Sequence, residues 1–219
     1  MDRNKNLLIV GAGIYGLVAK EIADSLKCFE NIAFVDDIKT ETSNGIKVVG
    51  TTKDIEKLTL EYGNAFVAIG NAEVRLQLIR KIEEEMPCRI VTLVSPRAYV
   101  SPSAQIGKGS IVEPMAVVHT GCVIATGCII SASAVVNHAS MCCDGVHVDC
   151  NATVAGHTLV PAGTKVCSGQ VFKRDEVKSE DLFFNPIEWE KKLQTIQTGN
   201  SNGTPQPING KVYSFDDVM

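Results

Sequence analysis

The sequence predicts a small α/β domain with a parallel, Rossmann-like sheet, followed by a left-handed parallel β-helix of hexapeptide repeats. Two patterns carry this prediction. Residues 1–97 alternate short apolar runs with amphipathic stretches, as in a parallel sheet with crossover helices. From Val100 to Phe172 an apolar residue recurs at every sixth position without an insertion. The 219 residues, 45% of them hydrophobic, suffice for the cores of two such units.

Strands and helices of the expected α/β domain alternate along residues 7–94. The expected strands are short apolar runs, namely LLIV, NIAFV, AFVAIG and RIVTLV. The expected helices cover residues 16–27, 54–62 and 72–85. In the last of them Val74, Leu78 and Ile82 share one apolar face, so this helix should pack on the sheet.

The hexads define the expected β-helix. An apolar side chain begins each hexad, and a small residue follows four positions later in most of them. If each hexad forms a short strand and a turn, three hexads close one triangular coil of eighteen residues. Because each residue then lies over the one eighteen positions earlier, we expect two internal columns. They consist of Val100, Val118, Val136 and Val154, and of Ala104, Cys122, Ser140 and Thr158.

These patterns divide the chain into three segments. Residues 1–97 form the α/β domain, and residues 98–173 form the β-helix. In residues 174–219, a polar stretch precedes the run from Pro186 to Gln197, which indicates a short capping helix, and a tail rich in Gly, Asn and Pro follows.

Composition excludes several classes of partner. Lys and Arg number 21 against 25 Asp and Glu, so the chain offers no basic surface for nucleic acid. The apolar run LLIV is too short for a signal peptide or a membrane span, and we expect a cytoplasmic protein with no membrane partner and reduced thiols. Cys142, Cys143 and Cys150 lie near two histidines, but no C-x-x-C pair occurs, so we expect no metal.

A glycine-rich loop follows the first expected strand. Gly11, Gly13 and Gly16 form G-x-G-x-x-G, and Asp36 ends the next strand. Such a loop lets a phosphate approach a helix N-terminus, while the carboxylate accepts hydrogen bonds from a ribose or base. Asn71 should lie at the same carboxyl edge of the sheet. The domain is little longer than one mononucleotide-binding half, which favours a mononucleotide over NAD; glycines that only permit tight packing would show the same pattern.

All four histidines lie in the hexad region. His119, His138, His147 and His157 occupy different hexad positions, so they form no single column and their roles should differ. Acyl transfer from a thioester to an amine or hydroxyl needs a base, and an imidazole suits that role near neutral pH. A backbone N–H stabilises the oxyanion that develops. Gly156 follows His138 by eighteen residues, so its amide should lie one coil away from this candidate base.

The chain resembles the bacterial acetyltransferases of sugar-modifying pathways. These include sialic acid O-acetyltransferases and N-acetyltransferases of UDP- or dTDP-linked 4-amino-sugars. The resemblance covers residues 7–172 and rests on LLIVGAGIYG, FVDD, AFVAIGNAEVR, LVSPRAYVSPSAQIG and VVNHASMCCDGVHVDCNATVAG. It implies transfer from acetyl-CoA by a homotrimer that holds acetyl-CoA between neighbouring β-helices. The acceptor it implies is a nucleotide-linked sugar or sialic acid, bound at the α/β domain.

The resemblance also implies roles for individual residues. By it, His138 is the general base, His147 lies near the acetyl thioester, and the amide of Gly156 binds the thioester oxygen. The substrate-binding residues that it implies are Gly11, Gly13, Tyr15, Gly16, Asp36, Asp37 and Asn71.

Three departures from the family pattern leave an alternative open. Ala139 follows the base, where the family often has an acidic residue. Tyr15 and residues 95–97 stand where histidines are common, which leaves the nucleotide and the sugar undefined. The hexads end at Phe172, whereas relatives usually continue for a further coil. The alternative is a catalytically silent trimeric scaffold that binds nucleotide or CoA.

Overall fold

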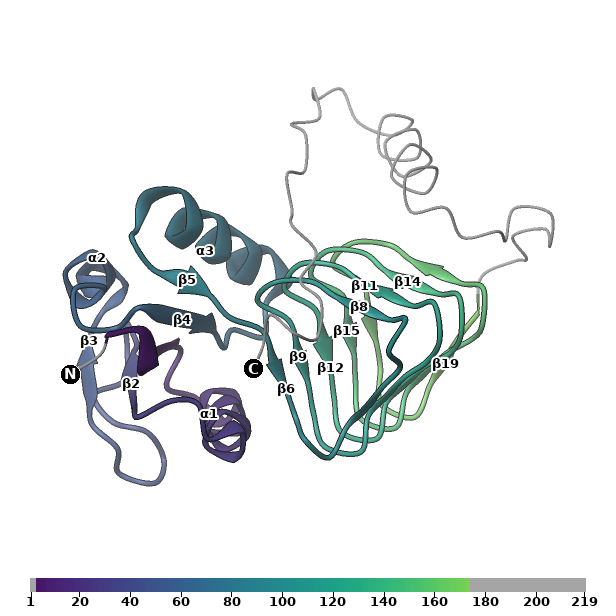
Figure 1. Ribbon diagram of the computed structural model, residues 1–219, viewed down its shortest axis with the longest axis horizontal. Helices are drawn as coiled ribbons and strands as arrows, with labels where there is room; N and C mark the ends of the chain where they lie inside the picture. The colour runs from purple at the N-terminus through teal and green to yellow at the C-terminus, as the bar shows by residue number, and fades with distance from the viewer. Residues whose placement is uncertain (1–2, 174–219) are drawn as a thin grey trace.

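The computed structural model describes residues 3–173. The expected capping helix and tail at residues 174–219 lie outside the described residues. Two units lie side by side, an α/β domain and a three-sided, left-handed β-helix (Figure 1). Both parts of the expected fold are therefore confirmed.

The α/β domain is built on five parallel strands in the order β3-β2-β1-β4-β5. They are β1 (Asn6–Val10), β2 (Asn31–Val35), β3 (Val48–Gly50), β4 (Asn64–Val67) and β5 (Arg89–Ile90). The central strand β1 is buried along its whole length, which explains its unbroken apolar run. Because β1 has β2 on one side and β4 on the other, the loops after β1 and β4 flank the point where the strand order reverses.

Helices cover both faces of this sheet. They are α1 (Ile14–Leu26), α2 (Ile55–Leu58) and α3 (Ala72–Glu85), with short 3-10 turns η1 (Arg3–Lys5) and η2 (Thr52–Asp54). Helix α1 packs on one face of the sheet, and α2 and α3 pack on the other. The buried side of α3 includes Ile79 and Ile82, but Val74 is 42% exposed. The prediction that Val74 lies on the buried face is therefore wrong. The first buried residue of α3 is instead Arg75, whose side chain turns toward the β-helix.

The β-helix has three faces of short parallel strands. Face 1 contains β7 (Tyr99–Val100), β10 (Val117–Val118), β13 (Val135–Val136), β16 (Thr153–Val154) and β19 (Val171–Phe172). Face 2 contains β8 (Gln105–Ile106), β11 (Val123–Ile124), β14 (Met141–Cys142) and β17 (Leu159–Val160). Face 3 contains β6 (Leu93–Val94), β9 (Ile111–Val112), β12 (Ile129–Ile130), β15 (His147–Val148) and β18 (Lys165–Val166).

Strand pairing confirms the eighteen-residue coil. Val118 pairs with Val100 on one side and with Val136 on the other, and Val136 pairs in turn with Val154. The second expected column also lies inside, where Cys122, Ser140 and Thr158 are buried and Ala104 packs against the core. The sequence RIVTLV divides between the two units, because β5 joins the sheet and β6 joins face 3.

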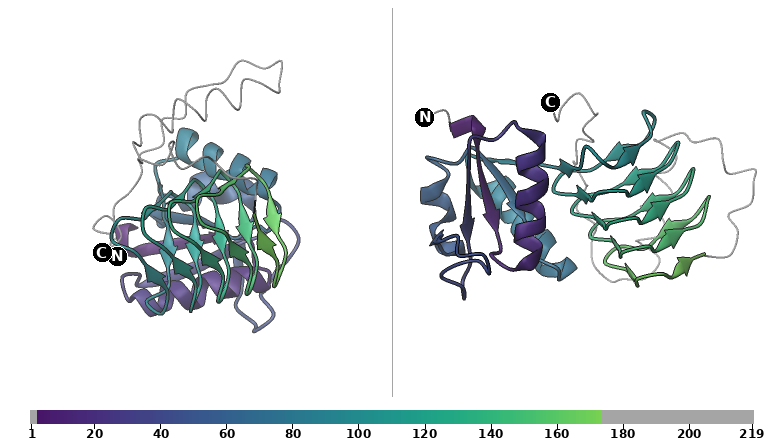
Figure 2. Two further views of the ribbon diagram at one scale, coloured as in Figure 1. Left: turned by 90° about the vertical axis from the view of Figure 1, so that its right-hand side faces the viewer. Right: turned by 90° about the horizontal axis from the view of Figure 1, so that it is seen from below.

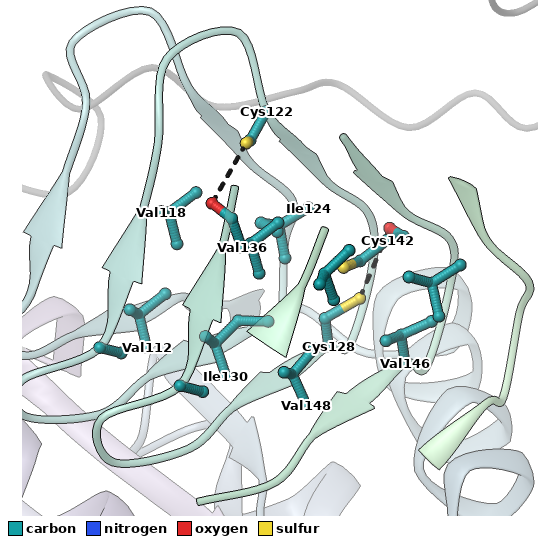
Figure 3. Packing of buried hydrophobic residues seen from close by; sticks show 14 of the residues in the cluster. Val112, Val118, Cys122, Ile124, Cys128, Ile130, Val136, Cys142, Val146 and Val148 are labelled. Carbon is teal, nitrogen blue, oxygen red and sulfur yellow. Dashed lines mark hydrogen bonds between the residues drawn. The ribbon is translucent and has the colours of Figure 1, made fainter. Parts of the chain in front are cut away.

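Small polar side chains in the interior satisfy backbone carbonyls at the corners. The thiol of Cys122 donates to the Asn137 carbonyl at 3.0 Å, and that of Cys128 donates to the Cys143 carbonyl at 3.1 Å. Figure 3 shows both cysteines among the inward aliphatic side chains. Burial raises the pKa of Cys128 to about 12, so this thiol keeps its proton. These two cysteines therefore act as small hydrogen-bond donors.

Face 3 carries the contact with the α/β domain. Ile111 and Ile129 on its outer side share one apolar cluster with Ala19 of α1, and α1 lies between the sheet and the β-helix (Figure 2). The buried guanidinium of Arg75 adds polar contacts: Nε donates to the Gly127 carbonyl at 2.7 Å and Nη2 to the Gly145 carbonyl at 2.9 Å. The other nitrogen, Nη1, donates to the loop between β4 and α3. This network links the carboxyl edge of the sheet to the β-helix.

Candidate active site

The glycine loop contains two glycines that serve packing and one that faces open space. A Cβ at Gly16 would lie 2.0 Å from the Gly11 carbonyl oxygen, and a Cβ at Gly11 would lie 2.7 Å from the Ala68 carbonyl oxygen. Gly11 also has φ +111°, a conformation that favours glycine. At Gly13, the N-cap of α1, an added Cβ would meet no neighbouring atom within 4 Å. A ligand can therefore approach the backbone at Gly13.

Asp36 lies directly against this loop. Its Oδ2 accepts a hydrogen bond from the Ala12 amide at 2.8 Å, and its Oδ1 accepts from the amides of Ile38 and Lys39, each at 2.9 Å. Burial raises the pKa of Asp36, but these amide hydrogen bonds outweigh burial and bring the pKa below its ordinary value. The carboxylate is thus charged and organises the loop after β1.

Two further expected substrate residues also have partners within the chain. The Asp37 carboxylate accepts hydrogen bonds from the amide and hydroxyl of Thr52, the amide at 2.8 Å. Asn71 caps α3, where its Oδ1 accepts from the Val74 amide at 3.0 Å. Both residues follow strands of the sheet and so lie on its carboxyl side, where the sequence analysis expected Asn71.

Tyr15 points into the junction between the two units. Its hydroxyl is buried and, within residues 3–173, has no hydrogen-bond partner. Burial raises the pKa of Tyr15 well above its ordinary value, and the negative charge of Glu113 adds to the increase. The positive charge of Arg75 has the opposite, smaller effect. The phenol therefore stays protonated beside the β-helix.

His138 occupies the corner between face 1 and face 2, which we call the histidine corner (residues 101–104, 119–122, 137–140 and 155–158). Its Nδ1 lies 2.8 Å from Oδ1 of Asn137. The same Oδ1 accepts the His138 backbone N–H at 2.9 Å, so it is the amide oxygen and cannot donate. Nδ1 must then carry the ring proton, which leaves Nε2 with a free lone pair. This is the tautomer that a general base needs.

Gly156 lies against the other edge of this ring. A Cβ at Gly156 would lie 3.0 Å from Cε1 and 3.1 Å from Nε2 of His138, so any larger residue would push the imidazole out of this position. No residue among 3–173 accepts a hydrogen bond from the Gly156 amide. A free donor and a free lone pair are thus close together, as the eighteen-residue spacing predicted.

Three histidines form a row along the histidine corner. The ring centroid of His138 lies 6.0 Å from that of His119 and 4.8 Å from that of His157. As predicted, the four histidines form no column of the eighteen-residue repeat. Their nineteen-residue spacing, which is visible in the sequence, nevertheless brings these three rings together diagonally across successive coils.

His147 belongs to a separate polar cluster on face 3. Its Nε2 lies 3.1 Å from Oγ of Ser131 and 3.8 Å from Oδ1 of Asp149. Burial lowers the pKa of His147 and outweighs the opposing effect of Asp149, so the ring is neutral at neutral pH. Glu113 lies in the same column as Ser131 and Asp149, and burial raises its pKa. Sequence analysis missed these three residues, although their eighteen-residue spacing is readable.

One chain does not bring all of these parts together. The α/β domain packs on face 3, and the histidine corner is the corner opposite that face. His138 therefore lies on the far side of the β-helix from the glycine loop and from His147. Within residues 3–173 no group of three His, Cys, Asp or Glu is arranged to hold a metal ion. In the same part of the chain no helix has the length and apolar character to cross a membrane.

Comparison with known proteins identifies relatives of both units. The sequence model of the PglD N-terminal domain matches residues 6–82. No curated protein sequence matches the chain. The acetyltransferase domain of PglB from Neisseria gonorrhoeae FA1090, solved in complex with acetyl coenzyme A, is 34% identical. That match covers 77% of this chain and 82% of the PglB chain, with a TM-score of 0.73.

A second solved relative is PerB from Caulobacter crescentus, in complex with CoA and GDP-perosamine. It is 25% identical, with a TM-score of 0.65 over 78% of this chain and 89% of that one. The matches to PglB and PerB extend across both units, and the PglB match has the identity and coverage of a true relative. The chain belongs to the hexapeptide-repeat sugar acetyltransferases, enzymes that combine a small α/β domain with a left-handed β-helix.

Proposed function

We propose that the chain transfers an acetyl group from acetyl-CoA to an amine, or a hydroxyl, of a nucleotide-linked sugar, with His138 as the general base. The observation that carries this proposal is the pairing of the His138 Nε2 lone pair with the free amide of Gly156. The relatives support the substrates, because PglB was solved with acetyl coenzyme A and PerB with CoA and GDP-perosamine.

The two groups suit the two charges that develop during acyl transfer. Nε2 of His138 takes a proton from the acceptor as its nitrogen or oxygen attacks the thioester carbon. The carbonyl oxygen becomes an oxyanion that the Gly156 amide stabilises. When the carbon–sulfur bond breaks, the CoA thiolate leaves and takes the proton from the imidazolium. No charge then remains on the enzyme.

The carboxyl edge of the sheet suits the nucleotide. Gly13 exposes backbone at the N-terminus of α1, which favours a phosphate group. Asp36 and Asp37 keep lone pairs that can accept from ribose or base in addition to their internal hydrogen bonds. Asn71 starts α3 at the same edge. UDP-, dTDP- and GDP-linked amino sugars are the acceptors to compare, with free sialic acid as the acceptor that lacks a nucleotide diphosphate.

A homotrimer would bring the separated parts together. The glycine loop and the His138 of one chain lie on opposite sides of the β-helix, so a shared site requires a second copy. The outer sides of faces 1 and 2 are apolar enough to pack against such a copy. On face 1 Tyr99 is 55% exposed and Val171 68% exposed, and on face 2 Met141 and Leu159 are partly exposed. Light scattering of the purified chain would give the number of copies.

Turnover of purified protein tests this proposal. We would offer acetyl-CoA with each nucleotide-linked amino sugar and with sialic acid, and follow the release of free CoA thiol. The expected result is turnover with at least one acceptor and its loss in His138→Ala, while the number of copies stays unchanged. His119→Ala is the matched control and should keep its turnover, because the His119 ring lies farther away, at 6.0 Å. Binding of acetyl-CoA without transfer to any acceptor would instead favour the silent scaffold.

A further inference from the structure

We propose that His157 is a positioning residue, which holds the imidazole plane of His138 so that Nε2 faces the acceptor. This inference rests on the proposed function, in which His138 is the base. It concerns tilting of the His138 ring, a motion that the contacts with Asn137 and Gly156 do not restrict. Asn137 holds the Nδ1 edge and Gly156 lies beside the Nε2 edge, but neither prevents the exposed ring from tilting.

The ring of His157 supplies this restraint. Its centroid lies 4.8 Å from that of His138 with an angle of 90° between the planes, an edge-to-face contact. The backbone strengthens the link, because the His157 amide donates to the His138 carbonyl at 3.0 Å. The two residues are thus joined through both main chain and side chain. Ala139, the other neighbour of His138 in sequence, has no side-chain atom that could hold the ring.

The backbone and the ring of His157 are both in unfavourable states, which argues that its side chain does not serve stability. His157 has φ +57°, a left-handed conformation that favours glycine. The equivalent position of other hexads is glycine at Gly121, Gly127, Gly145 and Gly163, and Met115, Ser133, Ala139 and Asn151 adopt the same left-handed conformation there. In addition Nδ1 of His157 is buried and, among residues 3–173, has no hydrogen-bond partner. Among these left-handed positions it is the unpartnered buried nitrogen that distinguishes His157, and a strained backbone combined with such an atom is typical of functional sites.

Substitution of His157 separates positioning from stability. In His157→Gly the left-handed strain disappears and the ring is lost, so the melting temperature should stay the same or rise while kcat falls about ten- to hundredfold. KM for acetyl-CoA and for the acceptor should stay within about twofold, because a positioning residue acts on His138 and not on either substrate. His157→Asn, which tolerates the same backbone but also lacks the ring, should behave alike. His157→Phe restores an aromatic edge and should keep kcat within about threefold of the wild type.

Ser133→Gly is the matched control, since Ser133 is exposed and has φ +60° at the equivalent position of another corner. It should relieve the same strain without a change in kcat. Unchanged kcat in both His157→Gly and His157→Asn would overturn the inference, and so would a kcat for His157→Phe as low as that of His157→Gly. Retained turnover in His138→Ala, or none in the wild type, would instead contradict the proposed function, so the two failures are distinguishable.

Discussion

The imidazole of His138 lies directly against the backbone of Gly156 on the next coil, where an added Cβ would come within 3.0 Å of Cε1. This contact joins the proposed base to the proposed oxyanion donor. It also explains why position 156 carries glycine although its φ lies outside the left-handed region, since the ring occupies the space of a side chain. The position of the His138 ring therefore depends on the absence of a side chain at Gly156.

We expect Gly156→Ala to lower kcat about a hundredfold with little effect on folding. The His138 ring is exposed and can swing away from the new methyl group, so the fold need not rearrange. The displaced base then no longer faces the acceptor. Steady-state kinetics and a thermal melt on the same preparation check this. Wild-type kcat in the variant would show that the close contact has no part in the reaction.

We expect Asn137→Ala to lower kcat about ten- to hundredfold, because the His138 ring loses the acceptor that fixes its tautomer. Asn137→Asp keeps an acceptor at the same distance and should retain more activity than Asn137→Ala. Nitrogen NMR of the His138 side chain reports the tautomer directly. The same tautomer and rate in Asn137→Ala would rule out this role.

A substitution at Ala155 can block the Gly156 amide with a hydrogen bond to the side chain of the preceding residue. At two equivalent positions the residue before the amide caps it: Asn137, one coil earlier in the same corner, accepts from His138 at 2.9 Å, and Asp149, in another corner, accepts from Cys150 at 2.8 Å. Ala155 lies one coil from Asn137 and has no such oxygen. Ala155→Asn should therefore cap the amide and lower kcat about a hundredfold, the effect of losing one oxyanion donor.

The matched control for that change is Ala155→Leu, which adds a side chain of similar size without an acceptor. It should lose much less kcat than Ala155→Asn. Equal losses in the two variants would mean that bulk, rather than capping, impairs the enzyme, and equal retention would mean that the amide is not used.

Arg75 links the two units, and we expect Arg75→Met to destabilise the protein by at least about 2 kcal/mol. The substitution leaves buried carbonyls at Gly127 and Gly145 without their charged donor. Urea unfolding followed by circular dichroism measures the change. Arg80→Met, an exposed position on the same helix, should change stability by less than about 0.5 kcal/mol. Equal stability of the two variants would show that Arg75 does not hold the units together.

His147 should make folding stability depend on pH. Burial lowers its pKa in the folded state, whereas the unfolded chain has the ordinary value of about 6.5. As the pH falls through that value, the unfolded chain binds a proton that the folded chain does not, so stability falls. His147→Gln should lose less stability between about pH 7.5 and pH 5 than the wild type. Urea midpoints across this range test the point, and parallel curves for the two proteins would contradict it.

The eighteen-residue repeat explains why much of the fold and part of the site were predictable. It placed Val118 beside Val136 and Gly156 beside His138, because each coil repeats the same backbone path. Contacts that cross the repeat were not predictable in this way. The pairing of His138 with His157 needs an offset of nineteen residues, and His157 adopts a left-handed backbone conformation that its residue type does not predict.

The α/β domain shows a second limit. The carboxylate of Asp36 was expected to face a ligand, yet three of its hydrogen bonds come from backbone amides of adjacent loops, and loop geometry is not encoded in residue spacing. The sequence does not predict a buried Arg75, because a charged residue on a helix usually faces water. Its burial depends on carbonyls that a distant segment presents, such as that of Gly127.

A crystal structure of the assembled protein with acetyl-CoA tests the central claim most directly. The decisive quantity is the distance from the acetyl carbonyl oxygen to the amide nitrogen of Gly156. We predict about 2.7–3.1 Å, with Nε2 of His138 facing the thioester carbon. A thioester bound beyond about 4 Å from this amide would contradict the account, because the lone pair of His138 and the donor of Gly156 would then serve no common reaction.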